Sequence, residues 1–185
     1  MHHDSDISGM KVAILLDQQY EDLEFWYPYY RLKEEGCQVV AVSAKAGETY
    51  PSKHGYPAKS DVSAGDVKAG DFDAVVVPGG FSPDFMRRQD SMVNFIRDAA
   101  DARIPIACIC HGVWMLCCTG ALRGRNCTSY KSIRYDVENA GGRWVDKECV
   151  RDGPIITSRT PADLVAFCRT LIDAMAEAHA PAGAK

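Results

Sequence analysis

The hydrophobic residues of this chain are concentrated in short, nearly uninterrupted runs. Residues 11–17, 38–43, 73–78 and 104–109 are made largely of Val, Ile, Leu and Ala. Runs of this length and composition are typical of strands that are buried on both faces, as in a parallel sheet. We therefore expect these four segments to form the centre of a mostly parallel sheet.

The segments between these runs have an amphipathic pattern. In residues 21–36, apolar and aromatic side chains recur at roughly helical spacing, and Gly36 supplies a C-terminal stop. The same reasoning predicts helices over residues 91–102, 132–140 and 161–178, and two further strands, residues 143–150 and 154–158, around an Asp152-Gly153 turn. Strands that alternate with helices predict a doubly wound α/β fold, with helices on both faces of the sheet.

This fold predicts where ligands bind. In a doubly wound sheet the ligand crevice lies at the carboxyl ends of the central strands. Three loops should meet there: residues 18–22, residues 79–84, and the turn that begins at Cys110.

Length and composition favour one domain. The 185 residues, 46% of them hydrophobic and 25% charged, suffice for a single compact core. We expect a flexible segment at residues 1–10, one domain over residues 11–178 and a frayed tail at residues 179–185. Neither metal nor cofactor is required by any motif.

Net charge and hydropathy indicate which classes of binding partner are to be expected. A formal net charge of −4 leaves no basic stripe for nucleic acid. No run approaches the roughly 18 apolar residues that cross a bilayer, and the polar start of the chain does not resemble a signal peptide. The expectation is a cytoplasmic protein that binds neither nucleic acid nor membrane.

The eight cysteines lie largely within apolar runs, which favours reduced thiols that serve mainly in packing. Their spacing is unsuited to zinc, because Cys108 and Cys110 are too close and the neighbours Cys117 and Cys118 cannot easily bind one ion together. Whether Cys117, Cys118 and Cys127 have a redox role stays open.

Cys110 stands out because the strand over residues 104–109 is expected to run through a turn at Cys110 directly into a helix, as at the nucleophile elbow of hydrolases. The backbone N–H groups at a helix start favour thiolate over thiol, and thiolate is the reactive form. The alternative is an ordinary buried thiol, which is how we interpret Cys108.

Three residues are candidate partners of Cys110. His111 can act as a general base or simply cap the turn. Glu21 follows the first strand in an apolar setting, where burial would raise its pKa and let it donate a proton; alternatively it stabilises a helix N-terminus. Gly80 could form an oxyanion hole with the N–H of His111, although a plain tight turn would have the same sequence.

Several motifs together resemble the ThiJ/PfpI superfamily, and most closely its PfpI-type branch. They cover about residues 11–172 in the family's order: Glu21-Asp22 with Glu24, Lys53-His-Gly-Tyr56, Asp73 to Gly80, Cys110-His-Gly112, Arg123-Gly-Arg125, Thr128-Ser-Tyr130 and Ser158 to Asp163. The resemblance implies a flavodoxin-like α/β sandwich. It also implies a dimer or higher homo-oligomer without cofactor or metal.

The resemblance assigns roles residue by residue. Cys110 matches the nucleophile, and Glu21 matches the glutamate that contacts it. Asp84 matches an acidic residue that a neighbouring subunit donates to the histidine, here His111, although family members usually carry Glu there. Gly80 matches the oxyanion-hole glycine, and Tyr130 matches a tyrosine at the pocket rim.

Two classes of function remain open. The first is a stress-related enzyme in which Cys110 attacks an electrophilic carbonyl, either as a glutathione-independent glyoxalase or as a hydrolase or peptidase on a small carbonyl or peptide substrate. The second is a redox-sensing or chaperone-like stress protein in which Cys110 is oxidised. The family resemblance determines the nucleophile better than it determines the substrate.

Overall fold

A computed structural model describes residues 7–180. Its main sheet has seven strands in the order β10-β11-β7-β6-β1-β2-β5. These are β10 (Cys149–Asp152), β11 (Ile155–Ser158), β7 (Ile106–Ile109), β6 (Ala74–Val77), β1 (Lys11–Leu15), β2 (Gln38–Ser43) and β5 (Val62–Ser63). All neighbours are parallel except β10 and β11, which form an antiparallel hairpin at one edge. The predicted α/β fold is therefore confirmed.

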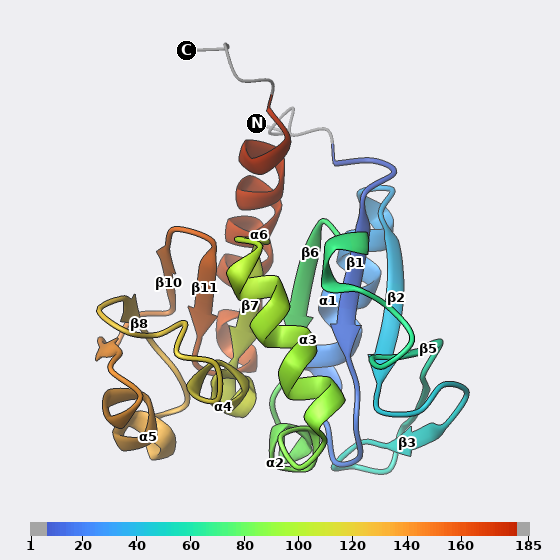
Figure 1. Cartoon of the computed structure of the whole chain (residues 1–185), viewed down its shortest axis with the longest axis horizontal. Coiled ribbons are helices and arrows are strands. Elements are labelled where there is room, and N and C mark those ends of the chain that lie inside the picture. Colours follow the sequence, from blue (N-terminus) through green and yellow to red (C-terminus); the bar gives the residue numbers. More distant parts are fainter. Residues whose placement is uncertain (1–6, 181–185) are drawn as a thin grey trace.

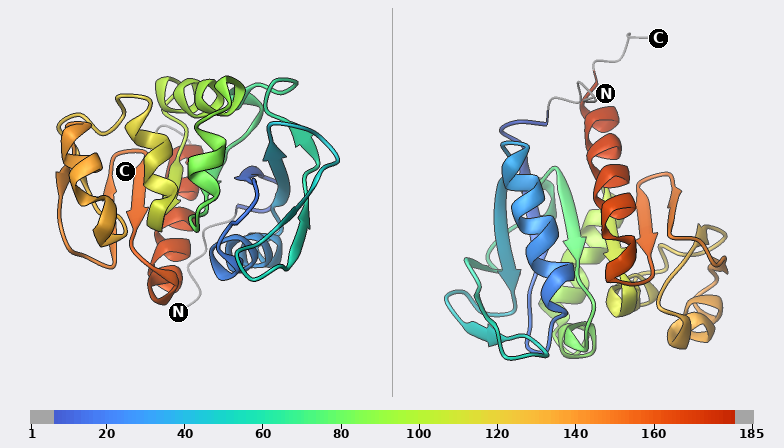
Figure 2. Two further views of the ribbon diagram at one scale, coloured as in Figure 1. Left: turned by 90° about the horizontal axis from the view of Figure 1, so that it is seen from below. Right: turned by 180° about the vertical axis from the view of Figure 1, so that it is seen from behind.

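Helices cover both faces of the sheet. Helices α1 (Asp22–Glu34) and α6 (Leu164–His179) pack on one face, and α3 (Asp90–Asp101) packs on the other (Figures 1 and 2). The short helices α2 (Ser82–Met86), α4 (Trp114–Cys117) and α5 (Arg134–Asn139) lie at the end of the molecule to which the central strands point (Figure 1). Single 3-10 turns occur at Ala69–Asp71, Cys110–Val113, Lys131–Ile133 and Pro161–Asp163.

Each central strand contributes to two hydrophobic cores. In β1, Ala13 and Leu15 belong to the core under α3, whereas Val12 and Ile14 belong to the core under α1 and α6. Alternation follows from the pleat, because successive side chains point to opposite faces. This is why the strand sequences are apolar throughout rather than alternating.

Some predicted boundaries are wrong. Residues 143–150 were expected as one strand, but the structure has β9 (Arg143–Trp144), a break at the polar residues 146–148, and then β10. Strand β9 pairs with β8 (Asn126–Cys127) in a separate two-stranded sheet. A third small sheet joins β3 (Thr49–Pro51) and β4 (Pro57–Lys59). The loop that connects them, residues 52–56, contacts the start of α1.

Residues just outside the expected domain boundaries make contacts with the rest of the chain. Within the segment expected to be flexible, Ile7 is buried and its carbonyl accepts a hydrogen bond from the Cys37 thiol. At the other end, α6 includes His179, whose Nε2 lies 2.8 Å from Asp73 Oδ1. Expectations for residues 1–6 and 181–185 lie outside the described residues. No helix among the described residues is long and apolar enough to span a membrane.

Candidate active site

Cys110 directly follows β7 and begins the 3-10 turn Cys110–Val113. Its φ of 60° lies in the left-handed region, which a residue with a side chain rarely adopts. Such backbone strain costs on the order of 1–3 kcal/mol and is characteristic of functional sites. The sharp turn that the sequence predicts therefore exists.

The thiol of Cys110 is nearly enclosed, with the residue only 7% exposed. Burial raises its pKa, and a negative charge on Glu24 raises it further, whereas N–H groups of His111 and Gly80 donate hydrogen bonds that lower it. The expected stabilisation of thiolate by a helix start is weak, because the turn and α4 contain only four residues each. Burial therefore predominates, and the resting site holds a thiol.

Glu24 is the carboxyl group that lies against Cys110. It belongs to the first turn of α1, is fully buried, and interacts with the thiol. Its Oε2 accepts a hydrogen bond of 2.8 Å from the N–H of Gly79, and its Oε1 has no hydrogen-bond partner among the described residues, which leaves that oxygen available to the thiol. Burial and the neighbouring Glu21 raise the pKa of Glu24 to about 8, so that it is protonated at neutral pH.

The structure places Glu21 at the N-terminus of α1. It is the N-cap of α1, and its Oε2 accepts a hydrogen bond of 2.8 Å from the N–H of Glu24. Its Oε1 lies 3.5 Å from Lys53 Nζ. Of the two interpretations of Glu21, the structure supports the helix-terminal one, and Glu24, one turn further on, contacts Cys110. Sequence alone could not distinguish these acids, since both are N-terminal residues of one amphipathic helix.

His111 is positioned to exchange a proton with Cys110. Its Nδ1 lies 3.3 Å from Cys110 Sγ, and its Nε2 lies 3.2 Å from Ser132 Oγ. Burial lowers the pKa of His111; Asp136 partly opposes this effect and Lys53 adds to it. The imidazole is therefore neutral at pH 7 and able to accept a proton.

Aromatic rings hold the imidazole of His111. Tyr130 stacks on it, with ring centroids 5.0 Å apart and an interplanar angle of 29°. Trp114 contacts it edge-on at 4.9 Å, and the Trp114 indole donates a hydrogen bond to Asp136 Oδ2. Tyr130 is 42% exposed, consistent with the expected position at the rim.

Gly79 and Gly80 bring backbone close to the thiol. A Cβ on Gly79 would lie 2.6 Å from Glu24 Oε2 and 2.7 Å from Cys110 Cβ, so no side chain fits between the acid and the cysteine. Gly80 has a φ of 72°, and a Cβ there would lie 2.4 Å from Gln19 O. The N–H groups of Gly80 and His111 both donate to Cys110, so two backbone donors lie beside the thiol.

Asp84 does not contact His111 within the described chain. It lies on α2, and its carboxylate pairs with Arg87, at 2.9 Å, and with Arg88. Hydrogen bonds from Arg88 and Arg87 lower its pKa. Asp84 is therefore ionised at neutral pH, and in the single chain its carboxylate forms ion pairs with these two arginines.

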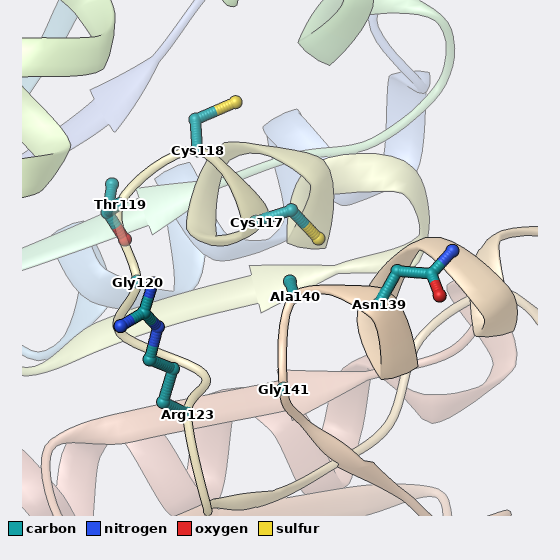
Figure 3. Close-up of a pocket in the computed structure, with 8 residues that line it drawn as sticks. All are labelled: Cys117, Cys118, Thr119, Gly120, Arg123, Asn139, Ala140 and Gly141. Atoms are coloured by element: carbon teal, nitrogen blue, oxygen red, sulfur yellow. The ribbon is translucent and has the colours of Figure 1, made fainter.

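A cavity of about 820 Å³ lies apart from these residues, at the end of α4 (Figure 3). It is lined by Cys117, Cys118, Thr119, Gly120, Arg123, Asn139, Ala140 and Gly141. The thiols of Cys117 and Cys118 point in different directions in Figure 3. The sequence predicted that Cys118 packs in the core, but it is exposed. Across residues 7–180, no group of three or more His, Cys, Asp or Glu side chains is arranged to hold a metal ion.

Comparison with known proteins shows the family of this chain. The sequence pattern of the DJ-1/PfpI family matches residues 10–174. The chain belongs to the DJ-1/PfpI family. It is 45% identical over 163 residues to a protein of Pyrococcus horikoshii named as a deglycase, covering 88% of this chain and 98% of that protein. It is 43% identical over 159 residues to YraA of Bacillus subtilis, named as a candidate cysteine protease, covering 86% of this chain and 94% of that one.

A solved structure shows the same fold. The DJ-1/ThiJ/PfpI-like part of a two-domain protein from Anabaena variabilis, which also carries a ferritin-like domain, superposes with a TM-score of 0.87 at 39% identity. The match covers 89% of this chain and 47% of that larger chain. The predicted family and its flavodoxin-like α/β architecture are thus confirmed.

Proposed function

We propose that this DJ-1/PfpI protein is a cysteine-dependent enzyme that acts on electrophilic carbonyl groups, with Cys110 as the nucleophile. The observation that carries the proposal is the enclosure of one thiol by a neutral imidazole, a protonated carboxyl and two backbone N–H donors. Addition of a thiol to a carbonyl requires a base for the S–H proton and donors for the new oxyanion. The site supplies both.

For a 2-oxoaldehyde the steps are as follows. As the S–C bond forms, His111 Nδ1 accepts the thiol proton, and N–H groups of Gly80 and His111 stabilise the oxygen until it is protonated, giving a hemithioacetal. Neutral His111 then accepts the proton of the former aldehyde carbon, while protonated Glu24 donates a proton to the neighbouring carbonyl oxygen, which gives an enediol. His111 returns its proton to that neighbouring carbon and Glu24 recovers the hydroxyl proton of the first carbon, which produces the thioester of a 2-hydroxy acid. Water cleaves the thioester and releases a 2-hydroxy acid and the free thiol. No external oxidant is needed, because one carbon is oxidised while its neighbour is reduced.

The relatives are named for two reactions that are chemically related to the proposed one. A deglycase removes a carbonyl adduct from an amine, and a cysteine protease forms an acyl-enzyme at an amide carbonyl; both begin with thiol attack on a carbon bound to oxygen. The near-complete enclosure of Cys110 favours small carbonyl compounds over folded protein substrates.

We further propose a homodimer as the working unit, in which Asp84 reaches His111 of the partner subunit. The ionised state of Asp84 and the absence of a carboxylate hydrogen bond to His111 among the described residues support this arrangement. The shorter reach of Asp relative to Glu makes the spacing between the subunits critical.

A product assay distinguishes the reactions. The purified protein is incubated without glutathione with methylglyoxal, with a glycated amine and with an unfolded peptide, and lactate, free amine and new peptide termini are measured. We expect lactate or free amine in preference to peptide cleavage. If none of the products forms while Cys110 oxidises readily to sulfinic acid, the carbonyl enzyme is contradicted and the redox role is favoured.

A further inference from the structure

The loop of residues 52–56, between β3 and β4, lies near the candidate active site. The backbone N–H of Lys53 donates a hydrogen bond of 3.0 Å to the carbonyl of Tyr20. Tyr20 in turn pairs with Gly80, one of the two N–H donors at Cys110. Tyr20 therefore connects the backbone of Lys53 to Gly80, a residue of the predicted oxyanion hole.

This loop is firmly attached to the start of α1. Ser52 Oγ donates a hydrogen bond of 2.6 Å to Asp22 Oδ1, and His54 Nδ1 lies 2.7 Å from Asp22 Oδ2. These contacts fix the residues on both sides of Lys53. Its side chain therefore starts from a defined place beside the site.

The Lys53 ammonium group is only partly engaged. Its Nζ lies 3.5 Å from Glu21 Oε1, beyond a short hydrogen bond, and its side chain is 43% exposed. An ammonium has three N–H donors, so some are left for a ligand. Its charge also acts on Glu24 and His111, the two residues that flank the Cys110 thiol, and lowers the pKa of both.

We propose that Lys53 is a specificity-determining residue whose ammonium group binds a carboxylate carried by the substrate next to the carbonyl that Cys110 attacks. This inference rests on the proposed function and adds that, among small carbonyl substrates, those that bear a carboxylate are preferred over uncharged ones such as methylglyoxal.

Alkylation of Cys110 tests this proposal independently of turnover. Iodoacetate and iodoacetamide attack the same thiol, but only iodoacetate carries a carboxylate. The rates of both are measured at Cys110 by peptide mass spectrometry, and their ratio is compared among the wild type, Lys53→Met, Lys53→Arg and Lys59→Met. Lys59 is the matched control, since it is an exposed lysine in the same hairpin.

We expect the ratio of iodoacetate to iodoacetamide rates to fall about threefold to fivefold in Lys53→Met, the range typical of a partly exposed ion pair, and to be kept in Lys53→Arg and Lys59→Met. A change in the ionisation of Cys110 alters both rates equally and leaves the ratio unchanged. An unchanged ratio in Lys53→Met, or an equal fall in Lys59→Met or Lys53→Arg, overturns the proposal. Because the readout is alkylation, failure of the carbonyl chemistry is detected separately by the product assay.

Discussion

The Nδ1 atom of His111 lies 3.3 Å from the Sγ atom of Cys110, although the two residues are adjacent in the chain. Sequence neighbours rarely direct their side chains at one another, and here the left-handed backbone of Cys110 accompanies that geometry. The imidazole is neutral at pH 7 because burial lowers its pKa. A neutral base in contact with a buried thiol is the arrangement on which the proposed chemistry depends.

Tyr130 should matter because it holds the His111 ring by stacking. We expect Tyr130→Ala to reduce kcat/KM for methylglyoxal about tenfold, because a displaced base lowers the efficiency of proton transfer. Tyr130→Phe, which keeps the ring, should retain most of the activity. Tyr135→Ala is the control for loss of an exposed tyrosine, since Tyr135 is 73% exposed. Equal effects of Tyr130→Ala and Tyr135→Ala would contradict the positioning role.

Glu24 should make folding stability dependent on pH. The pKa of its carboxyl is about 8 in the folded protein, against 4.5 as the ordinary value. The folded state therefore holds a proton that the unfolded state releases, and the free energy of unfolding falls as the pH rises from 4.5 to 8. The maximal slope from this one group is about 1.4 kcal/mol per pH unit.

Chemical denaturation of Glu24→Gln across this range checks the effect. We predict that the decline in unfolding free energy between pH 5 and 8 is shallower in Glu24→Gln than in the wild type. Glu34→Gln, an exposed change in the same helix, should leave the slope unchanged. The account of Glu24 as a buried, protonated acid is wrong if the wild type and Glu24→Gln have parallel curves.

These results show which parts of the site the sequence could predict. The apolar runs around Cys110 determine the strands, so the turn that carries Cys110, His111 and their N–H groups could be predicted from local pattern. The choice between Glu21 and Glu24 depends on where α1 begins, because an N-cap faces its own helix while a residue one turn later faces the sheet. Lys53 could not be placed, since its position depends on a loop fixed by contacts with Asp22 and Tyr20.

Gly80 should not tolerate a side chain, because its φ angle is positive and because a Cβ atom would also clash with neighbouring backbone. Gly80 and Gly124 have nearly equal φ values, 72° and 71°, but a Cβ on Gly80 meets backbone at 2.4 Å whereas one on Gly124 meets nothing within 4 Å. We expect Gly124→Ala to cost about 1 kcal/mol of unfolding free energy, and Gly80→Ala to cost several kcal/mol. Similar losses in thermal denaturation of the two variants would refute the close approach at Gly80.

The proposed contribution of Asp84 across subunits can be tested by complementation. Cys110→Ala lacks the nucleophile and Asp84→Asn lacks the acid, so each is expected to be impaired alone. In a mixed dimer, the Asp84→Asn subunit keeps Cys110 and His111, and the Cys110→Ala subunit supplies an intact Asp84 to that His111. We predict that mixing the two variants under conditions of subunit exchange raises activity above the sum of the separate samples. No gain after verified exchange would argue that Asp84 has no role across the interface.

The most direct test of the central claim is lactate formation from methylglyoxal without glutathione, measured for the wild type, Cys110→Ala and Cys118→Ala at equal folded concentrations. Cys118 is the matched control, because it is an exposed thiol away from His111 and Glu24. The account predicts turnover in the wild type and in Cys118→Ala, and its loss in Cys110→Ala. Turnover that survives in Cys110→Ala, or its absence from the wild type, would contradict Cys110 as the nucleophile of a carbonyl enzyme.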